Sequence, residues 1–500
     1  TSLKISDFRL NRDEQVIVKV SKEILTLYHI AIEEGSDDAD YEVFDLHHDI
    51  DEEKAVVHTV LSIINKDGTR MNAECTTEGS ADEAPRAEVH RLVKLNFYHL
   101  LHQLIELPPA PWGILHGVRP TKIVHRYIKK GLAKEAVIRR LMTDFEVSRE
   151  KAELITELAY YQRPFLEQTT PRTVSIYVGI PFCLSRCLYC SFPANVLPAN
   201  KELDRFMAAF QRDLDAVKRA VDTYGFTVQN IYIGGGTPTS LPDDYFEDMM
   251  QRVVSALYHP GVKEFTVEAG RPDSMSPAKI ACMVKYKVDR VSVNPQTMQQ
   301  RTLKRIGRQH TPEDIVTMYR DLREAGIPSI NMDLIVGLPG EGPEDMRDTI
   351  DKVLALGPED VTLHALALKR GSLLKMNLDE TELPDDKTVQ EMFDIALSSV
   401  VKSGRRPYYL YRQGYQSGQM ENIGCCVAGA ESLYNIQIME EHQTILGIGG
   451  AATSKIVNPR TMRLKTSFNA KDLAVYLDRV DTYIEKRDAL LAEAYGGEEE

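Results

Sequence analysis

Three cysteines close together in the chain, Cys183, Cys187 and Cys190, have the type and spacing of metal-cluster ligands. They follow an apolar run, in a loop that begins at Pro181. Three thiolates can bind three irons of a [4Fe–4S] cluster and leave the fourth iron without a protein ligand. A small ligand with an amine and a carboxylate could then chelate that iron. Zinc is one alternative, although the neighbouring sequence offers no fourth ligand for it. Three buried structural cysteines are the other.

The remaining cysteines do not suggest a disulfide framework. Cys425 and Cys426 are adjacent, Cys75 and Cys282 are isolated, and the total of seven is odd. A tight group of cysteines in a reducing compartment is typical of metal binding rather than cross-linking. We therefore expect a cytoplasmic protein.

Composition and charge exclude some classes of function. Hydrophobic residues make up 43% and charged residues 27% of the 500 residues, which is ordinary for a globular protein. The net charge of -14 argues against a nucleic-acid partner, because phosphate binding favours a basic surface. No apolar stretch approaches the ~20 residues that span a bilayer, and no signal peptide is visible. The length predicts two or three domains.

The elements that must position the cysteine loop alternate between strands and helices from Pro171 onward. Six apolar, β-branched runs are predicted strands: residues 174–180, 230–233, 264–268, 290–293, 330–336 and 360–366. The amphipathic helices between them predict parallel pairing. Six units are too few for a closed eight-stranded barrel, so we expect an α/β fold with an open, partial (β/α)6 barrel. The chemistry of such folds lies at the carboxyl ends of the strands, and the cysteine loop follows the first strand.

The sequence before and after the barrel does not show the regular alternation of strands and helices. We expect an N-terminal α+β domain with a helical connector over residues 1–165, the barrel over 166–372 and a C-terminal α+β cap over 373–500. In the first part, residues 15–20 and 24–32 are predicted strands, and 55–64 is a strand or a helix. In the last part, we expect short strands near 408–412, 435–439 and 444–448 and a helix over 471–493.

Two further motifs end predicted strands. Gly234-Gly235-Gly236-Thr237 ends the second strand, and glycines let backbone groups approach a ligand closely. No lysine follows at the spacing of a phosphate-binding loop, and a plain turn is the alternative. Glu268 ends the third strand, where its apolar neighbours favour a carboxylate inside the barrel mouth rather than on the surface.

Together these motifs resemble those of a known family. The run Tyr177-Val-Gly-Ile-Pro-Phe-Cys183, followed by Cys187 and Cys190, is similar to the opening of the radical S-adenosylmethionine (SAM) oxygen-independent coproporphyrinogen III oxidase (dehydrogenase) family. The resemblance extends to Ser454. The motif Gly113-Ile-Leu-His-Gly-Val-Arg-Pro-Thr-Lys122 is similar to the HemZ branch in particular.

The resemblance implies a [4Fe–4S] cluster on the three cysteines and SAM beside it. The positions that it implies for one SAM molecule or two are Tyr177, Gly235, Gly236, Thr237, Glu268, Gln296, Arg308, Asp333, Ala367 and Thr453. Glu268 would take the ribose hydroxyls, and Gln296, Arg308 and Asp333 would contact the second SAM. Without the resemblance, Tyr177 would be read as packing and Arg308 as a surface charge.

The implied activity belongs to anaerobic porphyrin and haem biosynthesis. A one-electron donor, such as flavodoxin or ferredoxin, would reduce the cluster, and SAM would yield a 5′-deoxyadenosyl radical that removes hydrogen from a propionate of coproporphyrinogen III. Loss of CO2 and one electron leaves a vinyl group, and two such events give protoporphyrinogen IX. The protein orients the cofactors and excludes water.

Propionate carboxylates need arginine or lysine partners. The candidates, each of which could equally lie on the surface, are Arg405, Arg406, Arg412, Arg119 and Lys122.

One position departs from the oxidases of the family, which carry a further cysteine two residues after the third cluster ligand. Here that position is Phe192, as in relatives that include haem chaperones. Three functions therefore remain: an anaerobic coproporphyrinogen III decarboxylase, a haem-binding or haem-trafficking protein that keeps the cluster, and another radical SAM reaction on a porphyrin, such as haem ring opening. The Cys425–Cys426 pair could supply a late thiol, but two small buried residues are the simpler interpretation.

We expect Cys187→Ala to abolish the iron–sulfur absorption near ~400 nm, because the cluster loses one of its thiolate ligands. An absorption spectrum of the anaerobically purified protein tests this. A brown chromophore that survives the substitution would show that these cysteines are not the cluster ligands.

Overall fold

The computed structural model describes residues 3–185, 188, 195–368, 373, 377–414 and 416–497. They form two compact units, Thr1–Gly117 with Ile123–Thr156, and Val118–Lys122 with Glu157–Glu500. Among the described residues, no helix is long and apolar enough to cross a membrane. The three domains bounded at residues 165 and 372 stay a prediction.

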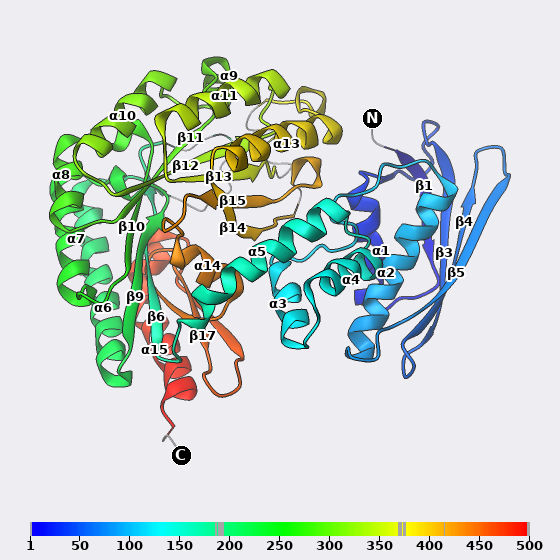
Figure 1. Cartoon of the computed structure of the whole chain (residues 1–500), viewed down its shortest axis with the longest axis horizontal. Helices are drawn as coiled ribbons and strands as arrows, with labels where there is room; N and C mark the ends of the chain where they lie inside the picture. The colour runs from blue at the N-terminus through cyan, green and yellow to red at the C-terminus, as the bar shows by residue number, and fades with distance from the viewer. Residues whose placement is uncertain are drawn as a thin grey trace. The chain divides into compact units, whose positions relative to one another are not determined.

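The first unit is a five-stranded sheet with helices against one face (Figure 1). Its strands, in the order β2-β1-β3-β4-β5, are β2 (Ala31–Ile32), β1 (Lys4–Leu10), β3 (Tyr41–Asp51), β4 (Val56–Ile64) and β5 (Arg70–Glu78). Its helices are α1 (Gln15–Leu27), α2 (Pro85–Leu104) and α4 (Lys134–Phe145), while α3 (Thr121–Lys129) and α5 (Arg149–Glu167) cross the boundary between the units along the chain. Phe44, Leu61 and Phe97 lie in its core.

Three predicted strands are helical wholly or in part. Residues 15–27 form α1, although residues 15–20 and 24–32 read as strands because of their β-branched side chains; in the second run, only Ala31–Ile32 form a strand, β2. The buried residues of α1 are Ile17, Ser21, Ile24 and Leu25, which is the spacing of one helical face. Residues 435–439 lie in α14 (Leu433–Glu440), where the Ser432 side chain accepts from the Asn435 amide and caps the helix.

The second unit contains one sheet of eleven strands, and all six predicted barrel strands are present in it. They run parallel in chain order as β6 (Thr173–Ile180), β9 (Thr227–Gly235), β10 (Glu264–Gly270), β11 (Arg290–Gln296), β12 (Ser329–Val336) and β13 (Asp360–Ala365). Within the described residues the strand order does not close on itself, so the expected α/β fold with a partial barrel is confirmed.

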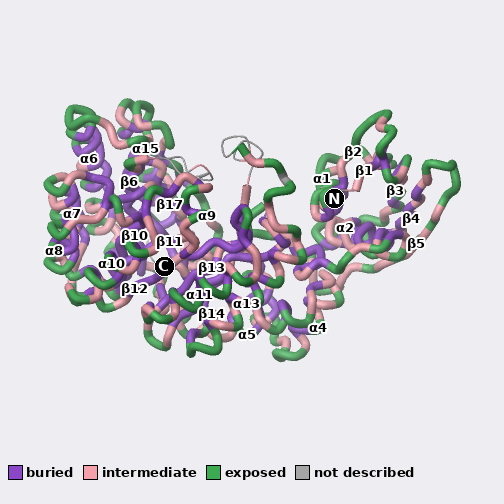
Figure 2. Tube along the Cα trace, turned by 90° about the horizontal axis from the view of Figure 1, so that it is seen from above, coloured by how far each residue is buried: buried purple, intermediate pink, exposed green. Residues whose placement is uncertain are grey.

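The C-terminal residues supply strands to both edges of this sheet. Next to β13 lie β15 (Asn422–Cys426) and β14 (Arg406–Tyr411), and next to β6 lie β16 (Thr444–Gly449), β17 (Thr453–Val457) and β18 (Leu464–Phe468). The helices that connect the barrel strands are α6 (Asn200–Tyr224), α7 (Asp243–Leu257), α8 (Pro277–Lys285), the short α9 (Gln300–Arg305), α10 (Pro312–Glu324) and α11 (Pro343–Leu356). Figure 1 shows them along the outer side of the sheet, and Figure 2 shows its central strands as mostly buried.

A buried carboxylate joins the C-terminal helix to the barrel. Asp213 of α6 and Arg487 of α15 (Leu473–Tyr495) are each 1% exposed and form an ion pair at 2.7 Å. Asp213 also accepts hydrogen bonds from the Gly449 amide (2.9 Å), the Tyr476 hydroxyl (2.9 Å) and the Asn469 side chain (3.1 Å). Because these donors belong to β16, α15 and the segment between β18 and α15, one side chain fixes three parts of the chain.

We expect Asp213→Ala to lower the free energy of unfolding by about 3–5 kcal/mol, because Arg487 is left as a buried charge without its ion-pair partner. The shift of the urea-unfolding midpoint measures this. The control is Asp222→Ala, which removes an exposed ion pair with Lys218 on the same helix and should cost less than about 1 kcal/mol. Equal costs for the two variants would contradict the role given to Asp213.

Candidate active site

The cysteine loop leaves the carboxyl end of β6 and lies beside the glycine-rich turn after β9. Its first residues form β7 (Phe182–Cys183). The Phe182 carbonyl accepts hydrogen bonds from the Thr237 amide (2.7 Å) and the Ser240 hydroxyl (3.1 Å). The Cys183 Sγ lies 3.7 Å from the Thr237 Oγ1. Two predicted parts of the site, Cys183 and Thr237, are therefore neighbours.

Segments after the next two strands hold the same loop. The Arg271 guanidinium, which follows β10, donates to the Ser185 carbonyl (2.8 Å) and hydroxyl (3.0 Å). The Leu188 amide donates to the carbonyl of Ile306, beyond β11 (3.3 Å). The predicted ligands Cys187 and Cys190 lie outside the described residues, as does Phe192. The described part of the loop is thus attached to segments that follow β9, β10 and β11.

The turn after β9 approaches the end of β6 more closely than a side chain would allow. Gly235 has a φ of 121°, and a Cβ on it would lie 2.5 Å from the Ile180 carbonyl oxygen. The Gly236 amide donates to that same oxygen at 3.0 Å. Glycine at position 235 is therefore required for this contact, which places Gly236 and Thr237 beside the cysteine loop.

Three aromatic rings and a carboxylate line the inner face on the β6–β10 side. Tyr232 stacks on Tyr434 at 4.5 Å and on Tyr177 at 6.1 Å between ring centroids. The Tyr232 hydroxyl donates to Glu268. The pKa of Glu268 is raised to about 7, mainly by burial. The Tyr232 donor acts to lower this pKa, and the charge of Asp333 acts to raise it. Glu268 thus lies inside the barrel, beside a tyrosine that the sequence did not single out.

Thr453 lies on the other side of β6 from the glycine turn. A Cβ on Gly447 would lie 2.7 Å from the Thr453 carbonyl oxygen, and Gly447 pairs in register with Tyr177. The Thr453 backbone therefore runs past the strand position opposite Tyr177. Ala367, after β13, forms an isolated bridge with Gln416.

A second group of polar residues lies on the inner face of β11 to β14. The Asp333 carboxylate accepts a hydrogen bond from the side-chain amide of Asn331 at 2.7 Å. When the side-chain nitrogen of Asn294 faces it, the carboxylate also accepts a hydrogen bond from Asn294 at 2.9 Å. The His364 Nε2 lies 3.8 Å from Asp333, and the His364 Nδ1 lies 3.3 Å from the Tyr411 hydroxyl. The sequence analysis did not single out His364 or Tyr411. Their position near the carboxyl ends of two predicted strands could have identified them.

The other two positions implied for SAM show local constraints. Gln296 follows a bulge in β11 and has a φ of 68°, a rare conformation for a residue with a side chain that often marks functional sites. Arg308 is only 6% exposed, so the surface alternative is wrong. Burial and the positive charge of Arg308 lower the pKa of His310 to about 4.

Most cations proposed for the propionates lie at the wrong end of the barrel. Arg119 (3.6 Å) and Lys122 (3.0 Å) pair with Glu441, just before β16 begins.

The Arg405 guanidinium donates to the carbonyl of Pro358, just before β13 begins (2.6 and 2.9 Å), and Arg406 covers the Tyr161 ring. These residues lie near the amino ends of the parallel strands. Of the five, Arg412 alone follows the carboxyl end of its strand, and burial lowers its pKa to about 10.

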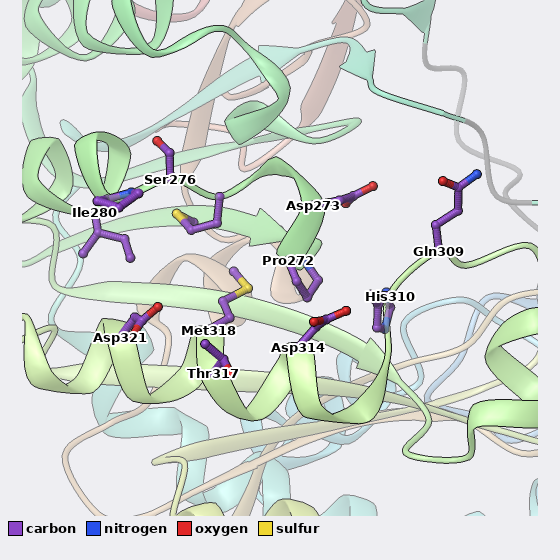
Figure 3. A pocket seen from close by; sticks show the side chains of 12 residues that line it. Pro272, Asp273, Ser276, Ile280, Gln309, His310, Asp314, Thr317, Met318 and Asp321 are labelled. Atoms are coloured by element: carbon purple, nitrogen blue, oxygen red, sulfur yellow. The ribbon is translucent and has the colours of Figure 1, made fainter.

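A groove of about 290 Å³ lies outside the barrel, between α8 and α10 (Figure 3). Asp273, His310, Asp314 and Met318 line it, and it includes none of the residues implied for SAM. The groove is therefore separate from the residues that the resemblance implies for SAM.

The class of the protein follows from two comparisons. Residues 177–353 match a family model described as the Radical SAM superfamily. The solved structure of coproporphyrinogen III oxidase (HemN) from Escherichia coli, described as a radical SAM enzyme, has a similar fold, with a TM-score of 0.52 and 23% identity over 65% of this chain and 72% of that one. The chain is a radical SAM protein.

Two relatives from Bacillus subtilis (strain 168) define the family. The oxygen-independent coproporphyrinogen-III oxidase-like protein HemZ is 38% identical over 391 residues, which cover 77% of each chain. The heme chaperone HemW is 28% identical over 293 residues, which cover 58% of this chain and 73% of that one. The chain belongs to the HemZ-like branch of the oxygen-independent coproporphyrinogen III oxidase family.

Membership of this superfamily implies a [4Fe–4S] cluster and SAM, and the described residues fit both. The Cys183 thiol lies at the carboxyl end of β6, beside Thr237 and a glycine turn without side chains. Glu268 presents a carboxylate from the inner face nearby. Among the described residues, no group of three or more His, Cys, Asp or Glu side chains is placed to hold a metal ion. The assignment of the cluster to Cys183, Cys187 and Cys190 stays a prediction.

We compare the free energy of unfolding of Glu268→Gln with that of the wild type. We expect the difference, variant minus wild type, to be on the order of 2–3 kcal/mol more positive at pH 8 than at pH 5. The Glu268 pKa is about 7 in the folded protein against 4.5 ordinarily, so the unfolded chain releases the proton first and wild-type stability falls as pH rises from 4.5 to 7. Glutamine does not titrate. Urea unfolding at both pH values measures the difference, with the exposed Glu485→Gln as control. The same effect at both pH values would contradict the raised pKa.

Proposed function

We propose that the chain is an anaerobic enzyme that converts propionates of coproporphyrinogen III to vinyl groups, giving protoporphyrinogen IX. The observation that carries this is the contact of Cys183 with Thr237 at the mouth of the partial barrel, in a chain of the HemZ-like family. Each converted propionate loses a hydrogen atom from its β-carbon, CO2 and one electron.

The residues around the cysteine loop would divide the work of binding. Cys183, Cys187 and Cys190 would hold the cluster. A reduced cluster with SAM bound would supply a 5′-deoxyadenosyl radical as the acceptor of the hydrogen atom. Gly235 and Thr237 would admit the amino-acid end of SAM, because the turn presents backbone groups without side chains.

Inside the barrel, Glu268 would accept the ribose hydroxyls and the Tyr177 ring would pack beside SAM. The stack of Tyr177, Tyr232 and Tyr434 would keep water from this side of the site, because three rings cover the inner face of β6 and β9. A one-electron donor of the flavodoxin or ferredoxin type is part of the proposal. A second SAM at Gln296, Arg308 and Asp333 stays a prediction.

Similarity to the heme chaperone HemW favours a second candidate, a haem-binding protein that keeps the cluster. The phenylalanine at position 192, where the oxidases carry a cysteine, also favours this candidate, although Phe192 lies outside the described residues. In this case the tetrapyrrole would be carried and not converted. Haem that stays bound in stoichiometric amount through purification would support this candidate.

We expect the reconstituted protein, incubated anaerobically with SAM, a reductant and coproporphyrinogen III, to form mono- and di-decarboxylated products. Chromatography of the oxidised porphyrins and of 5′-deoxyadenosine measures both halves of the reaction. Cys183→Ala, which removes a cluster ligand, is the control and should give neither. Formation of 5′-deoxyadenosine without any change in the porphyrin would refute the decarboxylase function.

A further inference from the structure

Arg271 joins the cysteine loop to the turn after β10, through a contact that the proposed function does not use. The residue is buried, with only 6% of its surface exposed. Its guanidinium donates to the Ser185 carbonyl at 2.8 Å from Nη1 and to the Ser185 hydroxyl at 3.0 Å from Nη2. Ser185 stands two residues after Cys183 and two before Cys187 in the chain. The contact therefore holds the loop at a point between two of the predicted cluster ligands.

Asp273 fixes the orientation of the Arg271 guanidinium. The Nε and Nη2 atoms donate to the two oxygens of the Asp273 carboxylate at 3.2 and 2.9 Å. The Asp273 side chain is 32% exposed and lines the groove shown in Figure 3. A carboxylate that binds one edge of a guanidinium through two oxygens sets the plane of the group. The other edge of Arg271 is thus directed at Ser185, which a lysine ammonium could not reproduce because it lacks the planar fork.

The backbone that carries Arg271 is fixed as well. The Ser274 hydroxyl donates to the Arg271 carbonyl at 2.8 Å and lies 2.7 Å from the hydroxyl of Thr239, in the turn Pro238–Ser240 after β9. The Lys279 ammonium donates to the Thr239 carbonyl at 2.7 Å and to the Ser274 carbonyl at 2.9 Å. All three side chains are buried. The turns after β9 and β10, which both contact the cysteine loop, are therefore tied to each other.

We propose that Arg271 is a positioning residue for the iron–sulfur cluster, which keeps the cysteine loop attached to the barrel and so slows the loss of iron. The inference rests on the part of the proposed function that places the cluster on this loop, and not on the tetrapyrrole reaction. The loop must detach before a chelator can remove the iron. Each detachment breaks the two charge-assisted hydrogen bonds that Arg271 donates to Ser185, which makes the detached state rarer.

The first test is the rate at which the reconstituted full-length chain loses iron to excess EDTA under anaerobic conditions, followed as decay of the absorption near ~400 nm. We expect Arg271→Met to lose iron about tenfold or more faster than the wild type, because groups that orient metal ligands contribute at least about that factor. Arg252→Met is the matched control. It breaks an ion pair with Asp248 (3.0 Å) within α7, away from the loop, and should leave the rate unchanged.

A pair of substitutions separates this contact from a general effect on the fold. Ser185→Ala removes the hydroxyl that accepts from Arg271 and keeps the carbonyl, so iron loss should accelerate by a smaller factor than in Arg271→Met. The double variant should be no faster than Arg271→Met alone, because both substitutions remove the same contact. Two independent structural defects would instead multiply the rates.

A second measurement needs no cluster. Trypsin can cleave after Arg186, the residue that follows Ser185. In the cluster-free chain we expect cleavage there, identified by mass spectrometry of the fragments, to be about tenfold faster in Arg271→Met, because the detached loop is populated more often. Cleavage at other sites should keep its wild-type rate.

Three results would overturn the inference. These are a wild-type rate of iron loss in Arg271→Met, multiplied rates in the double variant, and faster cleavage throughout the chain rather than after Arg186. If urea unfolding shows that Arg271→Met is not folded, Ser185→Ala decides, and a wild-type rate of iron loss there overturns the inference. Failure of the proposed function is distinct: a wild type that takes up no iron refutes the cluster, and one that holds the cluster but leaves coproporphyrinogen III unchanged refutes the reaction.

Discussion

The site depends on how closely β16, β6 and β9 approach one another at their carboxyl ends. A Cβ on Gly449 would lie 2.2 Å from the carbonyl oxygen of Gly179, and a Cβ on Gly235 would lie 2.5 Å from that of Ile180. Side chains at these points would push the strands apart. Because the loop that carries Cys183 leaves β6 here, its distance from the turn after β9 is set by this contact. Every role proposed for the cysteines, the turn and β17 presupposes it.

The inner face of the sheet is polar although parallel strands covered by helices are usually apolar on both faces. Near the amino ends, Arg290 and Asp360 form an ion pair at 2.9 Å with side chains 4% and 0% exposed, and the Tyr408 hydroxyl donates to Asp360 at 2.6 Å. Such a buried pair is tolerated only when its charges are matched and hydrogen-bonded. The pair fills the interior near the amino ends of the strands, although the Arg290 Nε and the Asp360 Oδ1 have no hydrogen-bond partner among the described residues. The carboxylates of Glu268 and Asp333 lie toward the other end of the strands, where the cysteine loop lies.

Sequence patterns predicted the barrel well because buried parallel strands are short, β-branched and evenly separated by amphipathic helices. The same cue failed at Gln15–Leu27, where Val16, Ile17 and Val18 suggested a strand but burial follows a helical face. The pattern also could not say at which end of the barrel a cation lies, which is why Lys122 was a candidate ligand although it pairs with Glu441 near the start of β16. Whether a strand residue points inward depends on the register of the strand. That register is set by pairing with segments distant in the sequence, which a local pattern does not reveal.

Glu268 and Asp333 are carboxylates on one interior face, and their surroundings move their pKa values in opposite directions. Burial prevails at Glu268, which has a tyrosine donor, whereas His364 and the Asn331 side chain prevail over burial at Asp333. Interacting acids separated in this way take different roles. Asp333 keeps its charge across the neutral range, because its pKa is lowered. Glu268 exchanges a proton near neutral pH, and a cationic cofactor beside it would lower its pKa and be held more tightly as pH rises. The two carboxylates of the barrel interior thus differ in charge near neutral pH, with Asp333 ionised and Glu268 partly protonated.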